Sequence, residues 1–379
     1  MSKSHLLARP KPLFTDRICI PGMSTGDMTE PTIKKSKLDV REGILFGIGN
    51  PLLDICAHAD KDFLDKYGLD ANTAILAEDK HKPMYGDMIK RFDVEYIPGG
   101  ACQNTFRTTQ WVLGLPERTT FCGCIGEDDY AKNMREKMAE AKVRTSYLVD
   151  KEQPTGTCAA VITGKNRSLV ANLAAANHFK KDHLLKPENW ALVEKAEFYY
   201  TPGFHLTVAP DAILAFAEHA LEHNKVFMTN LSAPFISQFF KEPQMQVMPY
   251  VDYLFGNETE FAAFAKEQNF GTENLEEVAL KAAALDKKNK KRQRVVVITQ
   301  GSNDTIVAQD GKVTKFPVML LKEEEIVDTN GAGDAFVGGF LAQLVQGKDV
   351  AECIRCAHYA ANYIIQRSGI SFDGKSDFQ

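Results

Sequence analysis

Short apolar runs alternate with helix-like stretches along most of this 379-residue chain. The apolar runs, rich in Val, Ile, Leu, Phe and Tyr, occupy residues 44–49, 197–201, 226–230, 251–256 and 295–299. Helical patterns occupy residues 209–222, 258–268 and 275–284. Strands that alternate with helices of this length form a mostly parallel sheet covered by helices on both faces. The sequence therefore predicts an α/β fold.

One segment departs from this alternation. Residues 158–163 and 168–172 flank the turn-like sequence Gly164-Lys165-Asn166-Arg167, which predicts a β-hairpin. A hairpin inside an α/β chain usually belongs to a subsidiary sheet, and we expect that sheet to act as a lid. The lid is assigned to residues 55–69, 74–98 and 153–173, with a return of the chain near residues 70–73, inserted in a large domain over residues 43–379. Residues 1–42 lack sustained periodicity and are expected to be a flexible extension.

Composition excludes several classes of protein. With 45 Lys+Arg against 50 Asp+Glu, the net charge of −5 argues against a nucleic-acid binder with a strongly basic face. No apolar run approaches the ~20 residues needed to cross a bilayer, and the N-terminus lacks the apolar stretch of a signal peptide. The eight cysteines lie among apolar neighbours, which predicts reduced, buried thiols. We expect a cytoplasmic protein that binds neither nucleic acid nor membrane; the basic run at residues 34–37 leaves a nuclear location open.

Two further patterns are interpreted as structural. The basic run within residues 286–294 is predicted to be a solvated loop before the strand at 295–299. Cys353 and Cys356 form a Cys-x-x-Cys pair, but no second pair accompanies them to complete a zinc site. We interpret them as ordinary cysteines of a helix.

The strongest local signal is the sequence Asp328-Thr329-Asn330-Gly331-Ala332-Gly333-Asp334, followed by an apolar helix over residues 337–345. Unpaired N–H groups at a helix start, aligned with the helix dipole, form a cradle for an anion such as a phosphoryl group. Asp334 would then lie in the first turn, where its carboxylate can reach a substrate hydroxyl. A structural alternative exists, because Asp favours helix starts and Gly favours turns. Neither a Walker A loop nor a complete Gly-x-Gly-x-x-Gly motif occurs.

This motif resembles the C-terminal signature of the ribokinase (PfkB) family of sugar and nucleoside kinases. The other family signature is present as Gly99-Gly100-Ala101-Cys102-Gln103-Asn104, followed by residues 123–128. The segments 49–54, 153–158, 166–173, 230–235 and 256–260 extend the resemblance, in particular to members that phosphorylate adenosine, from about residue 44 to the C-terminus. The resemblance implies a ribokinase-like fold, a mostly parallel sheet flanked by helices with a small β-rich lid. It also implies phosphoryl transfer from ATP to adenosine with Mg²⁺ as cofactor, a reaction of purine salvage.

The resemblance also implies roles for single residues. Asp334 would be the general base on the 5′-hydroxyl of adenosine, Gly331, Ala332 and Gly333 the anion hole, and Arg167, at the hairpin tip, a clamp on the transferred group. The adenosine site would comprise Asn50, Asp54, Leu76, Gly100, Asn104, Cys158, Leu169, Ala171, His205, Phe235 and Asn330. ATP would be bound by Asn257, Thr299, Gly301, His358 and Asn362, and Mg²⁺ would be held through water by Asn257 and Glu260.

Several of these residues have plainer interpretations. The Asn50-Pro-x-x-Asp54 sequence alone is more often a turn, Asn257 and Glu260 alone are more often a helix cap, and the apolar residues of the adenosine site are ordinary core types. Another sugar or nucleoside kinase of the family, and a catalytically inactive nucleoside-binding protein, remain alternatives. Selectivity is open because Ala101-Cys102 and His205 stand where family members often carry Ser-Thr and a second aromatic residue. We expect a monomer, since the lid serves as the cover of its own site.

Overall fold

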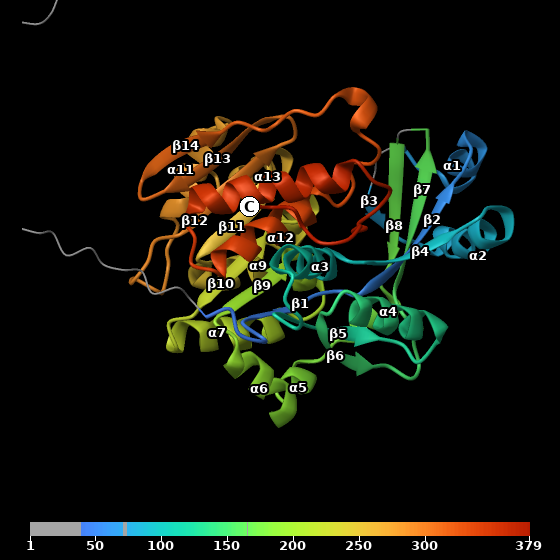
Figure 1. The fold of residues 1–379 in the computed structure, drawn as a ribbon, viewed down its shortest axis with the longest axis horizontal. Helices are drawn as coiled ribbons and strands as arrows, with labels where there is room; N and C mark the ends of the chain where they lie inside the picture. The colour runs from blue at the N-terminus through green and yellow to red at the C-terminus, as the bar shows by residue number, and fades with distance from the viewer. Residues whose placement is uncertain (1–38, 71–73, 165) are drawn as a thin grey trace, which may run out of the picture. The chain divides into compact units, whose positions relative to one another are not determined.

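The computed structural model describes residues 39–70, 74–164 and 166–379. The described residues belong to one compact unit (Figure 1). Of the predicted extension, residues 1–38 lie outside the described residues. Arg41 is described, and its guanidinium donates to the carboxylate of Glu197 at 2.7 Å.

A nine-stranded sheet forms the centre of the fold, in the order β14-β13-β12-β11-β10-β9-β1-β5-β6. Its strands are β1 (Leu45–Ile48), β5 (Thr119–Ile125), β6 (Arg144–Val149), β9 (Phe198–Pro202), β10 (Val226–Asn230), β11 (Tyr253–Asn257), β12 (Val295–Gln300), β13 (Asn303–Gln309) and β14 (Lys312–Phe316). All neighbours are parallel except β12–β13 and β13–β14, which are antiparallel. The five predicted strands are β1, β9, β10, β11 and β12, so the predicted α/β class is confirmed.

Helices cover both faces of this sheet. They are α3 (Ala101–Leu113), α4 (Asp129–Glu140), α5 (Lys181–Leu184), α6 (Pro187–Lys195), α7 (Pro210–Glu222), α8 (Pro234–Phe239), α9 (Lys241–Val247), α10 (Glu258–Glu267), α11 (Leu275–Ala284), α12 (Ala332–Leu344) and α13 (Val350–Ile365). Alternate strand residues enter opposite cores: Val296 and Ile298 pack in one hydrophobic cluster with α7, α10 and α11, and Val295 and Val297 in another with α12 and α13. Burial of both faces explains why these strands read as continuous apolar runs.

A second sheet has five strands in the order β3-β8-β7-β2-β4. Its strands are β2 (Leu52–His58), β3 (Ala74–Leu76), β4 (Glu95–Gly99), β7 (Thr157–Thr163) and β8 (Asn166–Asn172). Helices α1 (Lys61–Tyr67) and α2 (Lys82–Arg91) lie beside this sheet (Figure 1). They pack on one of its faces through Phe63, Met84 and Met88. The other face carries Asp54, Cys158, Leu169 and Ala171, which line a cavity.

The second sheet differs in detail from the predicted lid. Strand β2 begins at Leu52 rather than at residue 55. Arg167 pairs with Ile162 within the β7–β8 ladder, so it belongs to a strand and not to the hairpin tip. The predicted return of the chain falls on residues 71–73, outside the described residues, whereas the carbonyl of Asp70 accepts a hydrogen bond from Ser168 of β8 at 2.8 Å.

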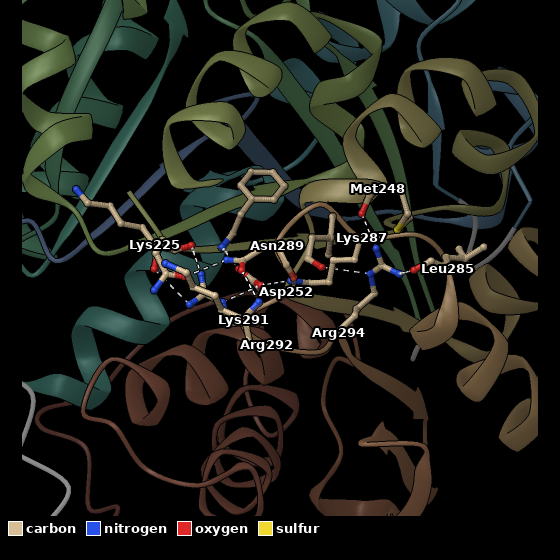
Figure 2. Close-up of polar contacts among 12 residues, drawn as sticks. Lys225, Met248, Asp252, Leu285, Lys287, Asn289, Lys291, Arg292 and Arg294 are labelled. Atoms are coloured by element: carbon tan, nitrogen blue, oxygen red, sulfur yellow. Dashed lines mark hydrogen bonds and ion pairs between the residues drawn. The ribbon is translucent and has the colours of Figure 1, made fainter. Parts of the chain in front are cut away.

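The basic run at residues 286–294 is not the predicted solvated loop (Figure 2). Arg294 is 1% exposed and donates to five backbone carbonyls, those of Met248, Val251, Ala282, Leu285 and Asp286, at 2.7–3.2 Å. Lys287 and Arg292 donate to the buried carboxylate of Asp252 at 2.7 and 2.8 Å. The prediction fails because α9 and α11 end here, and the carbonyls at helix ends need donors that cationic side chains supply. Only part of the run, including Lys288, Lys290 and Lys291, is exposed.

The described cysteines and helices agree with two further expectations. The seven described cysteines are free and buried, and Cys353 and Cys356 lie in α13. Cys19 lies outside the described residues. Within the described ranges, none of the helices is long and apolar enough to span a membrane.

Candidate active site

A cavity of about 680 Å³ lies where the carboxyl ends of the parallel strands meet the inner face of the second sheet and the start of α12. Such an edge is the usual ligand position in an open α/β sheet. Most of the predicted site residues line it, although they are far apart in sequence: Asn50, Asp54, Leu76, Gly100, Asn104, Cys158, Arg167, Leu169, Ala171, Phe235, Asn257, Glu260, Asn330, Gly331, Gly333 and Asp334. The predicted residues Ala332, His205, Thr299, Gly301, His358 and Asn362 are not among the lining residues.

The glycine turn before α12 requires glycine at its first position. Gly331 is the N-cap of the helix and has φ +75°, the left-handed region that favours glycine. A Cβ atom there would also lie 2.5 Å from the side chain of Ile370. The helix starts at Ala332, so the N–H groups of its first turn lie beside the cavity. Of these, the N–H of Ala332 makes a long bond of 3.3 Å to the carbonyl of Thr329.

Asp334 lies in the first turn of α12, as predicted, and is half-buried at the cavity. Its Oδ2 accepts a hydrogen bond from Asn104 Nδ2 at 3.0 Å. Burial raises the pKa of Asp334 to about 7; the Asn104 hydrogen bond opposes this, and the nearby Asp54 and Glu260 carboxylates add to it. A carboxylate with a pKa near neutrality is well matched to accepting a proton at physiological pH.

Asn50 and Asn104 are brought together by a close approach of two backbone segments. Gly100, the N-cap of α3, has φ +88°, and a Cβ atom there would lie 2.2 Å from the carbonyl oxygen of Asn50. A side chain at this position would separate the loop after β1 from the start of α3. Asn104, in the first turn of α3, consequently lies on the same wall of the cavity as Asn50.

Asp54 and Arg167 are neighbours on the inner face of the second sheet. Arg167 Nη1 lies 2.5 Å from Asp328 Oδ2, and Arg167 Nη2 lies 3.9 Å from Asp54 Oδ2. Burial raises the pKa of Asp54 to about 6, against the attraction of the Arg167 and Arg107 guanidinium groups. Arg167 is therefore buried at the cavity in a charged network, and it is not the solvent-facing arginine of a turn.

His205, one of the residues predicted for the adenosine site, is not among the residues that line the cavity. Its ring is 0% exposed, its Nδ1 lies 2.6 Å from Asn50 Oδ1, and it meets the ring of Phe179 edge-on. Burial lowers the pKa of His205 to about 3, so the ring is neutral. The side chain of the preceding residue, Phe204, lines the cavity, with its ring 6.1 Å from that of Phe235.

Asn257 and Glu260 form a capping box at the start of α10. Glu260 Oε2 accepts from the Asn257 backbone N–H, and Glu260 Oε1 accepts from Asn257 Nδ2, both at 3.0 Å. Burial raises the pKa of Glu260 to about 7. Both residues also line the cavity, so the cap and a role toward a ligand are compatible.

The residues predicted for ATP lie mostly outside this cavity. Thr299, in β12, has its hydroxyl 3.4 Å from the carbonyl of Gly256, and Gly301 follows that strand. His358 Nε2 lies 2.8 Å from the Thr305 hydroxyl, and Asn362 donates to the carbonyl of Met319 at 2.8 Å. The last two residues share one face of α13, as their spacing predicts, but the cavity does not join them to the other site residues.

A direct metal-binding cluster is absent from the described ranges, where no group of three or more His, Cys, Asp and Glu side chains could hold an ion. The two oxygens of Glu260 are each engaged by one donor of Asn257, which leaves a second acceptor position on each. Asn257 and Glu260 therefore have oxygens that fit the water shell of Mg²⁺.

Sequence reasoning did not assign a role to Phe204 and Ile370, which line the cavity, or to Asp328, whose carboxylate contacts the cavity residue Arg167. Asp328 opens the glycine motif and its carboxylate meets Arg167, but a spacing of 161 residues gives no signal for that contact. Phe204 was detectable in principle, since it follows the end of β9, at the ligand-binding edge of the sheet. Ile370 belongs to the C-terminal loop, whose sequence has no periodicity.

Comparison with known proteins agrees with this architecture. The profile of the pfkB family carbohydrate kinases matches residues 61–376. Adenosine kinase 1 of Arabidopsis thaliana is 53% identical over 337 residues, covering 89% of this chain and 98% of that protein. The adenosine kinase of Schizosaccharomyces pombe is 46% identical over 328 residues, covering 86% of this chain and 95% of the other.

Solved structures give the same result. Anopheles gambiae adenosine kinase, in complex with P1,P4-di(adenosine-5) tetraphosphate, matches with a TM-score of 0.86 and 50% identity over 89% of this chain and 100% of that one. Schistosoma mansoni adenosine kinase, in complex with 2-fluoroadenosine, matches with a TM-score of 0.85 and 38% identity over 89% and 99% of the two chains. The chain therefore belongs to the pfkB family of carbohydrate kinases, and within it to the group of the adenosine kinases.

Proposed function

We propose that this protein transfers the γ-phosphoryl group of ATP to the 5′-hydroxyl of adenosine, giving AMP and ADP in purine salvage. The observation that carries the proposal is the Asp334 carboxylate, half-buried at the start of α12 beside a glycine turn and lining the same cavity as Asp54 and Asn104. An acceptor hydroxyl, a base and an anion cradle can meet at this point. The adenosine kinases among its relatives support the substrate.

In this mechanism, Asp334 accepts the proton of the 5′-hydroxyl as its oxygen attacks the γ-phosphorus in line, and the bond to the leaving ADP oxygen breaks. The N–H groups of Gly331, Ala332 and Gly333, at the positive end of α12, stabilise the charge on the transferred group. The Arg167 guanidinium, which lines the same cavity, adds positive charge beside it. Together these groups hold the reacting atoms and neutralise charge without a covalent enzyme intermediate.

Different residues would contact the ribose and the base of adenosine. The Asp54 carboxylate can accept both ribose hydroxyls, while Asn50, Gly100, Asn104 and Asn330 complete the polar side of the site. The base would lie against an apolar wall made of Leu76, Cys158, Leu169, Ala171, Phe204 and Phe235. An apolar, aromatic wall favours a nucleoside over a hexose, which would need polar partners around the whole ring.

Mg²⁺ would neutralise negative charge on the phosphate oxygens of bound ATP. Asn257 and Glu260 would hold it through water, and Thr299, Gly301, His358 and Asn362 would contact the rest of the ATP molecule. The second sheet would act as a lid, because a competent base in an open site would also activate water toward ATP. Arg167 and the apolar wall would then close over the substrate with that sheet.

We also infer where and how the protein works. The seven free, buried cysteines are typical of a reducing compartment such as the cytoplasm or nucleus. A net charge of −5 gives no support to nucleic-acid binding. Since the lid covers its own site, a monomer is sufficient for catalysis.

A substrate panel tests the proposal. Formation of ADP is measured with Mg²⁺-ATP and either adenosine, guanosine, ribose or fructose as acceptor. We expect turnover of adenosine to exceed that of both sugars by at least about 100-fold, since a sugar leaves the apolar wall unfilled. Preference for ribose or fructose would favour another sugar kinase of the family. Tight adenosine binding without turnover would favour an inactive nucleoside-binding protein.

A further inference from the structure

We propose that Asp328 is a positioning residue for phosphoryl transfer, which holds the Arg167 guanidinium beside the glycine turn. This inference rests on the proposed function, because it concerns a step of that reaction. Asp328 is the first residue of the glycine motif, and the mechanism above gives it no role. It would not touch the reacting atoms, and it would act only through Arg167.

The Asp328 carboxylate joins three separate segments of the chain. Its Oδ2 accepts from Arg167 Nη1 of β8 at 2.5 Å and from the backbone N–H of Gly369 in the C-terminal loop at 3.1 Å. Its Oδ1 accepts from the backbone N–H of Asn330 at 2.9 Å, inside the turn that leads to Gly331. The side chains of Arg167 and Asp328 are only 7% and 9% exposed. A strand of the second sheet is thereby fixed to the phosphate-binding turn of the large domain.

The pair with Asp328 holds the Arg167 guanidinium in place, and the guanidinium stays charged. A guanidinium presents five N–H donors in a rigid fork, and the bond to Asp328 uses one nitrogen of that fork. The other terminal nitrogen donates to Cys56 Sγ at 3.2 Å and lies 3.9 Å from Oδ2 of Asp54, a residue that lines the cavity as Arg167 does. Without Asp328, the long arginine side chain would have to be ordered during the reaction itself, and the rate would fall.

A purely structural role for Asp328 makes a different prediction. If the carboxylate serves only to close the loop through the N–H groups of Asn330 and Gly369, its removal should act equally whether Arg167 is present or not. If it acts through Arg167, its effect on turnover should disappear when Arg167 has already been removed. A double-mutant cycle on kcat separates the two roles.

The cycle compares the unsubstituted protein with Asp328→Asn, Arg167→Gln and the double variant, at saturating adenosine and Mg²⁺-ATP. We expect Asp328→Asn to lower kcat about tenfold, with the KM for adenosine changed less than about threefold, because the guanidinium that Asp328 positions acts in the transition state. In the Arg167→Gln background the same substitution should change kcat by less than about twofold. Equal factors in both backgrounds, or an unchanged kcat in Asp328→Asn, would overturn the proposal.

Two controls keep these outcomes distinct. Asp373→Asn removes the ion pair with Arg367 on the same C-terminal loop, where the carboxylate is 84% exposed, and should leave kcat unchanged. If Asp328→Asn does not fold, as judged by its thermal transition, Asp328→Glu replaces it in the same cycle, with the same requirement that its effect vanish beside Arg167→Gln.

Failure of the unsubstituted protein to phosphorylate adenosine would contradict the proposed function, and the role of Asp328 with it. An active protein with additive effects contradicts the role of Asp328 alone.

Discussion

At the scale of single residues, three carboxyl groups that line the cavity have raised pKa values. Burial raises the pKa of Asp54 to about 6 and those of Glu260 and Asp334 to about 7. Each therefore binds its proton more tightly in the folded chain than in an unfolded one, and its charged form is the costly one. In the proposed mechanism the raised pKa suits Asp334 to its role, since a base needs a pKa near the working pH.

The rate should consequently depend on pH through Asp334. Because only the ionised carboxylate accepts a proton, kcat/KM for adenosine should rise with pH along an acid limb near pH 7. Asn104 donates to this carboxylate and opposes the rise in its pKa, while Asp54 and Glu260 face it and add to the rise. In Asn104→Leu the limb should therefore move to higher pH, by about one pH unit.

The position of the limb, measured from about pH 5.5 to 9, is the quantity to compare, because Asn104 also belongs to the proposed ribose site and its loss will raise KM. A limb that stays in place in Asn104→Leu would show that the hydrogen bond does not tune the base. Asn133→Leu offers a comparison at the same type of residue, in α4 and away from the cavity. It should leave the limb where it is.

At the scale of elements, the basic segment before β12 fastens several helix ends to the sheet (Figure 2). Arg294 donates to carbonyls at the ends of α9 and α11, and Asp252, just before β11, gathers Lys287 and Arg292. These groups lie where β10, β11 and β12 begin, whereas the cavity lies where the strands end. Stability and catalysis should therefore be separable in this part of the molecule.

Arg294→Met tests this separation. The substitution leaves five carbonyls without their charged donor, and we expect the free energy of unfolding to fall by about 2–4 kcal/mol. The matched control is Lys290→Met in the same run, which loses only an exposed ion pair with Asp286 and should change stability by less than about 0.5 kcal/mol. Urea denaturation followed by circular dichroism measures both.

The KM for adenosine should be the same in Arg294→Met as in the unsubstituted protein at temperatures where both are folded. Equal free energies of unfolding of Arg294→Met and Lys290→Met would mean that the Arg294 hydrogen bonds do not stabilise the fold. A changed KM would mean that the two ends of the strands are coupled.

The local sequence pattern was sufficient to predict the strands and helices, but it did not predict which of them contact one another. Apolar runs and helical periodicity located five strands and the helices α7, α10 and α11 to within two residues at their ends, because burial on both faces leaves a strong signal. The basic run at residues 286–294 was wrongly predicted to be a solvated loop. The local sequence does not indicate that the Arg294 side chain is buried against carbonyls at helix ends that are distant in sequence. Periodicity also gave no hint that the ring entering the cavity is Phe204 rather than His205.

The site was predictable to the extent that it follows from motifs. Asp334, Gly331 and Asn104 belong to short signatures whose spacing carries chemistry, and all three line the cavity. The Arg167–Asp328 pair depends on how the second sheet meets the start of α12, which is a property of the tertiary fold. Long-range ion pairs of this kind leave no pattern in a single sequence.

At the scale of the whole molecule, the cavity is shared by two sheets, so substrate binding should restrain one against the other. The chain passes between the sheets before β2, after β4, before β7 and after β8. If the second sheet is a lid, saturating adenosine should slow amide hydrogen exchange in β7 and β8, because closure buries them and removes local opening. Mass spectrometry of peptic peptides measures this.

Helix α11 serves as the internal reference for that experiment. Leu275–Ala284 packs on the large sheet away from the cavity, and its exchange should not respond to adenosine. Protection confined to the large sheet, with β7 and β8 unchanged, would contradict a moving lid. Equal slowing in α11 would indicate a general stabilisation and not closure.

The central claim, that Asp334 is the base of an adenosine kinase, is tested most directly by Asp334→Asn. The amide keeps the shape of the side chain and cannot accept the proton, so turnover of adenosine to AMP should fall by about 10²–10⁴-fold. Calorimetric titration should show adenosine binding within about threefold of the unsubstituted protein, because the proposed ribose and base contacts are intact. Full turnover in Asp334→Asn would exclude Asp334 as the base.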